Sequence, residues 1–127
     1  MIYHILPLVT RTKKYEHITP ILEDLHWLPV KHRIEYKIAL ITFNALNDIA
    51  PTYIADLISE YKPIRTLRSS SELLLRRPKS NTHFYGDRAF SVAAPRFWNS
   101  LPSEIRNLST LGHFKRALKT HIFKCVY

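Results

Sequence analysis

The side chains of this 127-residue chain that could carry out catalysis or hold a metal ion are ten acids, seven histidines and one cysteine, Cys125. His17 and His26 are close enough in sequence to meet in a folded chain. They have no cysteine partners, and the sequence lacks the i, i+4 histidine pair with glutamate that is typical of zinc hydrolases. We therefore interpret the histidines as packing or surface residues and predict no metal site.

Carboxylate clusters that hold two metal ions are the mark of polymerases and many nucleases, and the sequence has one adjacent acidic pair, Glu23-Asp24. This pair lies in a predicted helix without a strand-turn-strand pattern, which favours a solvated or helix-capping role. The serine run at 69–71 has no Gly-x-Ser-x-Gly elbow, and both glycines are isolated, so the sequence has no phosphate-cradling loop. We predict no catalytic residue, no cofactor and no small-molecule substrate.

The positive charge is the feature with functional promise, and it is unevenly distributed. The formal net charge is +9. Residues 1–60 contain six Lys or Arg against seven acids, a net charge of −1, whereas residues 61–127 contain thirteen against three, a net charge of +10. A polyanion would therefore be attracted to the second half of the chain.

Cations alternate with aromatic residues in this second half, a mixture that can neutralise phosphates while rings stack on unpaired bases. The candidate nucleic-acid-binding residues are Arg65, Arg68, Arg76, Arg77, Lys79, Arg88 and Arg96, interleaved with Phe84, Tyr85, Phe97 and Trp98. The alternative is structural. Phe97 and Trp98 stand in an apolar stretch that is typical of a core, and Arg88 and Arg96 could make hydrogen bonds that hold a hairpin to the helices.

Composition favours helices as the elements that position these residues. The chain is 46% hydrophobic and has two glycines among eight prolines, a balance typical of helices joined by proline-containing turns. A single cysteine excludes an intrachain disulfide and favours an intracellular, nuclear or cytoplasmic location over secretion. The apolar start at 2–9 is far shorter than the roughly 20 residues of a membrane span, so we predict no membrane segment.

Apolar spacing predicts five helical segments. A two-turn helix follows Thr19 as N-cap and Pro20 as first residue. A core helix covers residues 31–47 and should be buried over much of its circumference. One stripe consists of Ile34, Ile38, Ile41 and Ala45, and an adjacent stripe consists of Tyr36, Leu40 and Phe43. A third helix covers 52–61. A later helix is expected over at least the second half of 89–99, with Pro95 tolerated in its first turn. The last helix is expected over 109–123, where residues 111, 114, 118 and 122 share an apolar face.

Between these helices, the polar and basic segment 62–71 is typical of an exposed loop. Residues 72–77 and 82–85 could be two short strands around a turn at 78–81. The predicted fold class is therefore mainly α, a small helical domain with room for a short β-hairpin. Its parts are a lead-in at 1–16, a helical unit at 17–61, a basic loop and hairpin at 62–88, and C-terminal helices at 89–127, together forming one domain.

Several sequence motifs, taken together and in order, carry a family resemblance. They are 17–22 (HITPIL), 24–30 (DLHWLPV), 33–37 (RIEYK), 50–54 (APTYI), 86–102 (GDRAFSVAAPRFWNSLP), 114–115 (FK) and 118–123 (LKTHIF). In this order and spacing the chain resembles the C-terminal tail of the polyproteins of non-LTR (LINE-type) retrotransposons, downstream of the reverse transcriptase fingers, palm and thumb. The likeness extends from about residue 11 to residue 123.

The resemblance implies a post-polymerase segment without catalytic residues, because the sequence contains no Asp-Asp pair of the Tyr-x-Asp-Asp type. It makes residues 1–16 a truncated lead-in. It also implies that the partners would be RNA or an RNA-DNA hybrid and the upstream reverse transcriptase domains. Two alternatives stay open: a structural or protein-interaction module with an exposed apolar patch, for instance along 2–9, and a gene remnant with no independent function.

Overall fold

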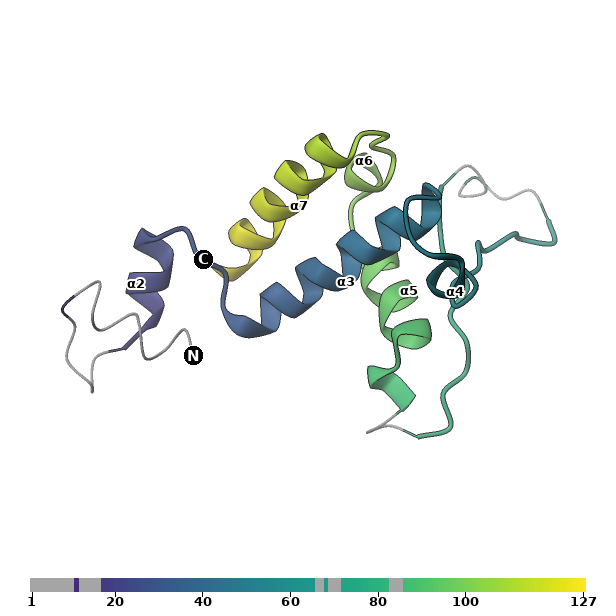
Figure 1. Cartoon of the computed structure of the whole chain (residues 1–127), viewed down its shortest axis with the longest axis horizontal. Coiled ribbons are helices and arrows are strands. Elements are labelled where there is room, and N and C mark those ends of the chain that lie inside the picture. Colours follow the sequence, from purple (N-terminus) through teal and green to yellow (C-terminus); the bar gives the residue numbers. More distant parts are fainter. Residues whose placement is uncertain (1–10, 12–16, 66–67, 69–71, 83–85) are drawn as a thin grey trace.

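A computed structural model of the chain describes residues 11, 17–65, 68, 72–82 and 86–127 (Figure 1). Within these ranges the fold is a small, mainly α domain with six α-helices: α2 (Thr19–Asp24), α3 (Val30–Leu46), α4 (Thr52–Ala55), α5 (Phe90–Ser100), α6 (Ser103–Arg106) and α7 (Leu111–Val126). The 3-10 turn η2 (Gly86–Arg88) precedes α5. The predicted helical class is confirmed. Among the described helices, none combines the length and the apolar character that crossing a membrane requires.

The core lies where α3 packs against α5 and α7. Three buried aromatic rings meet there: Phe43 of α3, Trp98 of α5 and Phe114 of α7. The ring centroid of Phe114 lies 4.3 Å from that of Phe43 and 5.8 Å from that of Trp98. The predicted stripe on α7 is confirmed, since Phe114, Leu118 and Ile122 are all buried. One core thus joins helices from both ends of the sequence.

The prediction for α3 is correct in part: Phe43 and Ala45 of the two predicted stripes are buried, but Ile34 and Ile41 of the first stripe are not. Ala39, Phe43 and Ala45 are buried, whereas Ile34 is 57% exposed and Ile41 is 36% exposed. The helix carries apolar residues around most of its circumference, so periodicity alone left two faces open. Small residues allow neighbouring helices to approach closely, and α5 brings its own small residues, Ala93 and Ala94, into the interior. The bulkier isoleucines are left outside.

The start of two helices also differs from expectation. Thr19 is the first helical residue rather than the N-cap, which is Ile18, and no side chain caps this end. Pro95 lies inside α5, not in its first turn, because the helix already begins at Phe90. A proline there removes one hydrogen bond of the helix. Its ring is nevertheless fully buried, so packing offsets part of that loss.

The third predicted helix, over 52–61, is wrong in length, because α4 ends at Ala55. The chain then becomes extended and pairs with residues 74–76. The amide of Tyr61 donates to the Leu74 carbonyl and the amide of Arg76 to the Ser59 carbonyl, both at 2.8 Å, around an antiparallel bridge between Glu60 and Leu75. These long-range bonds compete with continuation of the helix.

The hairpin considered for 72–77 and 82–85 is not formed by the described residues of these segments. Leu75 pairs with Glu60 instead, and residues 83–85 lie outside the described part. Three side chains hold the 72–75 segment against the helices. The Asn99 amide bonds both the amide and the carbonyl of Leu75 at 2.9 Å, and the Trp98 indole donates to the Leu73 carbonyl at 3.1 Å. Buried Arg106 donates to that carbonyl too, and to Glu72.

Candidate nucleic-acid interface

All seven predicted nucleic-acid-binding residues are exposed: Arg65, Arg68, Arg76, Arg77, Lys79, Arg88 and Arg96. Their side chains make no hydrogen bond or ion pair with another described residue. The two ion pairs of the described part use other groups, His32 with Glu35 and Arg106 with Glu72. Within the described part, no acid forms an ion pair with any of the seven cations.

The extended pairing between 59–61 and 74–76 brings distant cations together. Arg65 and Arg76 line one hollow of about 450 Å³ with Lys62, although eleven residues separate the two arginines in sequence. Glu60 is the one acid in this lining. Lys62 was missed by the sequence analysis, although its place at the start of the basic loop was a signal that could have found it. We call Lys62, Arg65, Arg76, Arg77 and Lys79 the basic loop cluster.

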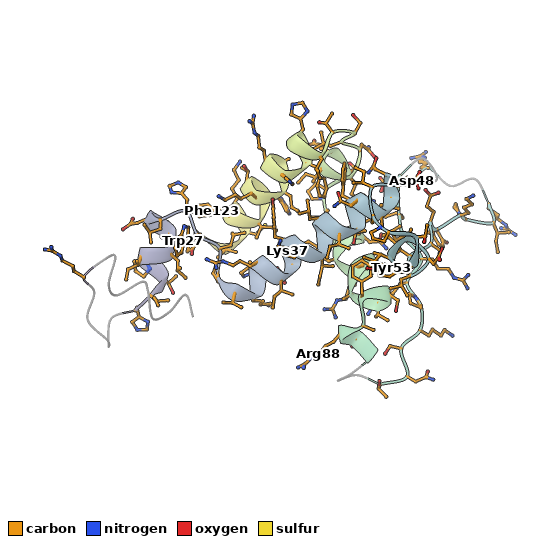
Figure 2. All side chains as sticks on the ribbon, viewed as in Figure 1. Trp27, Lys37, Asp48, Tyr53, Arg88 and Phe123 are labelled. Carbon is orange, nitrogen blue, oxygen red and sulfur yellow. The ribbon has the colours of Figure 1, made fainter. Side chains whose placement is uncertain are left out.

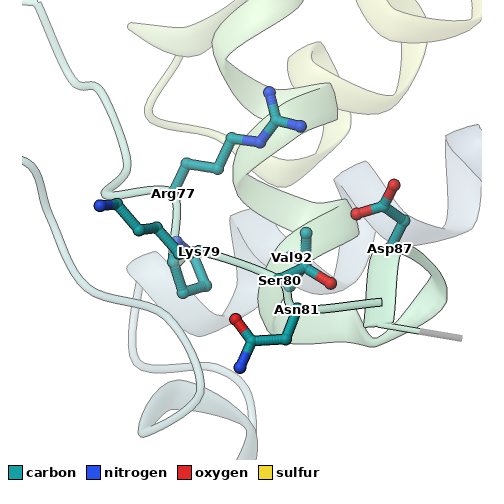
Figure 3. Close-up of a pocket in the computed structure, with 7 residues that line it drawn as sticks. Arg77, Lys79, Ser80, Asn81, Asp87 and Val92 are labelled. Atoms are coloured by element: carbon teal, nitrogen blue, oxygen red, sulfur yellow. The ribbon is translucent and has the colours of Figure 1, made fainter. Parts of the chain in front are cut away.

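A second hollow, of about 460 Å³, continues along the chain from Arg76 (Figure 3). It is lined by Arg77, Lys79, Ser80, Asn81 and Asp87, among others. Figure 3 shows Arg77 and Asp87 on facing sides and the Lys79 side chain directed away from both. The hollow therefore combines two cations with polar groups and one acid, a mixed lining that suits a phosphate-sugar backbone better than an apolar ligand.

A glycine shapes this second hollow. The Gly86 amide donates to the Thr82 side chain at 3.0 Å, and the Ser80 hydroxyl donates to the Thr82 carbonyl at 3.0 Å. A Cβ added at Gly86 would clash with the Ser80 hydroxyl. A side chain at Gly86 would therefore displace the Ser80 and Thr82 hydroxyls from the places they occupy between the turn at 80–82 and η2.

The remaining candidates are not gathered with the basic loop cluster. Arg96 projects from α5, and Arg88 ends η2 near the lower end of α5 (Figure 2). Neither lines the two hollows. Hydrogen bonds from Arg88 or Arg96 that hold a hairpin to the helices, the structural alternative, are not seen in the described part either. The segment at 72–75 is held by Asn99, Trp98 and Arg106 instead.

The aromatic residues divide between core and undescribed positions. Trp98 is 1% exposed and half-buried Phe97 packs against the core, so the core interpretation holds for both. Phe84 and Tyr85 lie outside the described residues. The described part of this interface thus offers exposed cations, and the exposed ring in its lining is that of Tyr61, in the first hollow.

Histidines and acids do not converge on a metal site among the described residues. The ring of His26 instead stacks on Phe123, with centroids 5.3 Å apart.

Comparisons with models of protein families, with curated proteins and with solved structures found no match to this chain.

Proposed function

We propose that this chain is a non-catalytic C-terminal module of a non-LTR retrotransposon reverse transcriptase that binds the phosphate backbone of RNA or of an RNA-DNA hybrid. The family part of the proposal depends on the sequence resemblance between about residues 11 and 123. In such a polyprotein the module would act inside the cell, in the nucleus or the cytoplasm, and would contact the upstream polymerase domains.

The observation that supports nucleic-acid contact is the basic loop cluster. Its five cations are exposed, and a bridge that joins segments about 15 residues apart in sequence (Glu60 and Leu75) brings two of them, Arg65 and Arg76, into one hollow. The Asn99, Trp98 and Arg106 side chains fix the backbone from which Arg76 projects. A cation held on a fixed backbone loses less conformational entropy when it binds a phosphate than one on a free loop.

The test is the salt dependence of binding to a single-stranded RNA, with duplex DNA as a second ligand and circular dichroism as the check of folding. We expect the Arg76→Ala/Arg77→Ala/Lys79→Ala variant to reduce the slope of log K against log salt by about 2 on single-stranded RNA. A Lys31→Ala/Lys37→Ala/Lys115→Ala variant removes the same charge from α3 and α7 and should keep the slope nearly unchanged. Equal slopes for the two variants would show that only net charge matters.

A protein-interaction module is the second candidate, and a specific observation favours it. Among the residues that the structure describes, nine large apolar side chains are exposed: Trp27, Val30, Ile34, Ile41, Ile49, Tyr53, Leu57, Tyr61 and Ile64. Where such side chains form a contiguous patch, they mark a protein contact. The segment at 2–9, where the sequence suggested such a patch, lies outside the described residues. A folded chain that fails to bind RNA but self-associates in sedimentation would favour this candidate.

A further inference from the structure

A second cationic surface lies at the end of the molecule opposite the basic loop cluster, where the turn after α2 meets the last turns of α7 (Figures 1 and 2). Two hollows of about 290 and 340 Å³ adjoin there and share His26 and Lys119. The first is completed by Trp27, Leu28, Arg33 and Tyr36, and the second by Thr120, Phe123 and Lys124. We call the two together the α2–α7 hollow. Its lining contains three cations and no carboxylate.

Two side chains from distant elements fix the backbone of this hollow. The Tyr127 hydroxyl donates to the Trp27 carbonyl at 3.1 Å, across 100 residues of sequence. Arg33 Nε donates to the Leu28 carbonyl at 2.7 Å, and its guanidinium lies 5.5 Å from the centre of the Trp27 ring. The Trp27 ring is therefore held in place although it is 41% exposed.

The backbone at His26 is strained. Helix α2 ends with the Trp27 amide donating to the Leu22 carbonyl and the His26 amide to the Glu23 carbonyl, the pair of bonds of a Schellman motif. The motif places His26 at φ 52°, in the left-handed region where glycine is usual. A side chain at such a position costs on the order of 1–2 kcal/mol. His26 instead presents a ring, which stacks on Phe123 with 5° between the planes.

The lining combines a mainly apolar surface with three cations, a combination that suits a nucleotide. Exposed faces of an indole and an imidazole can stack on a base, and ammonium groups can neutralise its phosphate. Burial raises the pKa of Tyr36, so its phenol adds no negative charge at neutral pH. The carboxylate of Glu23 lines neither hollow. Burial raises the pKa of Tyr127, and the nearby negative charge of Glu23 raises it further.

We propose that the α2–α7 hollow binds one unpaired nucleotide of a single-stranded nucleic acid, with the base against Trp27 and His26 and the phosphate on Lys119 and Lys124. This inference rests on the proposed function in one respect, since it takes the same class of ligand. It uses a separate set of residues. The two sites can therefore fail independently.

The test uses the full chain, labelled with ¹⁵N, and adenosine 5′-monophosphate as the probe. The two indole N–H signals report on different places: that of Trp27 on the α2–α7 hollow, and that of buried Trp98, bonded to the Leu73 carbonyl, on the basic loop side. We expect the nucleotide to shift the Trp27 signal and to leave the Trp98 signal in place. Inorganic phosphate and adenosine, each added alone, should bind more weakly than the nucleotide.

Two variants test the assigned roles. His26→Gly keeps the left-handed backbone and removes the ring, so it should fold as well as the parent and bind the nucleotide about tenfold more weakly, a change within the range of one base–aromatic contact. Lys119→Ala should lower nucleotide affinity, whereas Lys115→Ala, an exposed neighbour one helical turn away that lines neither hollow, should not. Unchanged binding by His26→Gly would overturn the stacking role.

The remaining outcomes are also decisive. If phosphate alone gives the same shifts and affinity as the nucleotide, the hollow binds anions and the inference is wrong. If the nucleotide leaves the Trp27 signal unmoved while RNA still binds through Arg76, Arg77 and Lys79, this inference falls and the proposed function stands. If the Trp27 signal shifts but the loop variant keeps its RNA affinity, the proposed role of the basic loop cluster falls instead.

Discussion

Of the large apolar side chains that the described residues expose, seven lie within residues 1–60 and the other two are Tyr61 and Ile64, whereas the described residues 72–82 and 86–127 expose none of this kind. Charge is divided the other way, with a net −1 on residues 1–60 and +10 on residues 61–127. Both parts contribute to a single core, since α3 packs against α5 and α7. One packing unit thus exposes large apolar side chains mainly from residues 1–60, the first part, and carries its excess positive charge on residues 61–127, the second part.

This difference matters because the two surfaces attract different ligands. Exposed apolar area favours association with another protein, and exposed cations favour a polyanion. The α2–α7 hollow lies where the two parts meet, since its exposed tryptophan comes from the first and its two lysines from the second. Under the proposed function, the apolar surface would face the upstream polymerase domains and the cationic surface would face the nucleic acid.

The largest expected effect tests whether the two parts share one core. Phe114→Ala removes the ring that contacts both Phe43 and Trp98, and we expect a loss of about 3–5 kcal/mol in the free energy of unfolding. Ile34→Ala, which shortens an exposed apolar side chain of the first part, should change it by less than about 0.5 kcal/mol. Urea unfolding followed by circular dichroism and tryptophan fluorescence measures both. Two separate transitions in the parent chain would contradict a shared core.

A smaller effect concerns the contact between the extended bridge and α5. Asn99→Ala leaves the buried amide and carbonyl of Leu75 without partners, which should cost about 2–3 kcal/mol. Asn107→Ala changes the same residue type at an exposed position after α6 and is the matched control. Hydrogen exchange at residues 74–76 should accelerate in the first variant only. Unchanged exchange there would mean that the bridge to 59–61 is sufficient to hold the segment that presents Arg76.

Sequence reasoning succeeded where local periodicity determined the outcome and failed where long-range pairing did. The stripe of α7 was predictable because its apolar residues occupy one face. On α3, whose apolar residues surround the helix, the choice of face depended on the small residues of α5. Residues 56–61 carry a helical pattern, yet backbone bonds to Leu74 and Arg76 hold Ser59 and Tyr61 extended.

The same reasoning explains what could be predicted of the sites. Exposed arginines in a basic loop follow from composition, so the candidates at 65, 76, 77 and 79 were identified from the sequence. Arg65 and Arg76 line one hollow because Glu60 and Leu75 form a bridge, and no local sequence pattern predicts that bridge. The α2–α7 hollow was out of reach, because it depends on Tyr127 meeting Trp27 across the length of the chain.

The smallest expected effect concerns the backbone positions with positive φ, which differ between the two parts. The described non-glycine residues with positive φ, Arg11, His26 and Asp48, all lie in the first part, whereas both glycines, Gly86 and Gly112, lie in the second and neither has positive φ. Asp48 follows α3 at φ 56°, where the Ile49 amide donates back to the Asn44 carbonyl. Glycine is thus absent where the backbone would favour it, and at Gly112 it occupies a helix where a Cβ would meet open space.

Opposite substitutions should therefore both stabilise the chain. Asp48→Gly relieves the left-handed strain, and after the entropy that glycine adds to the unfolded chain we expect a gain of about 0.5 kcal/mol. Gly112→Ala lowers the entropy of the unfolded chain within α7 and should add about 0.5–1 kcal/mol. Asp48→Val, which crowds the left-handed position further, should destabilise and serves as the control. Thermal unfolding measures all three, and a stabilising Asp48→Val would mean that the turn after α3 is not held in the left-handed conformation in solution.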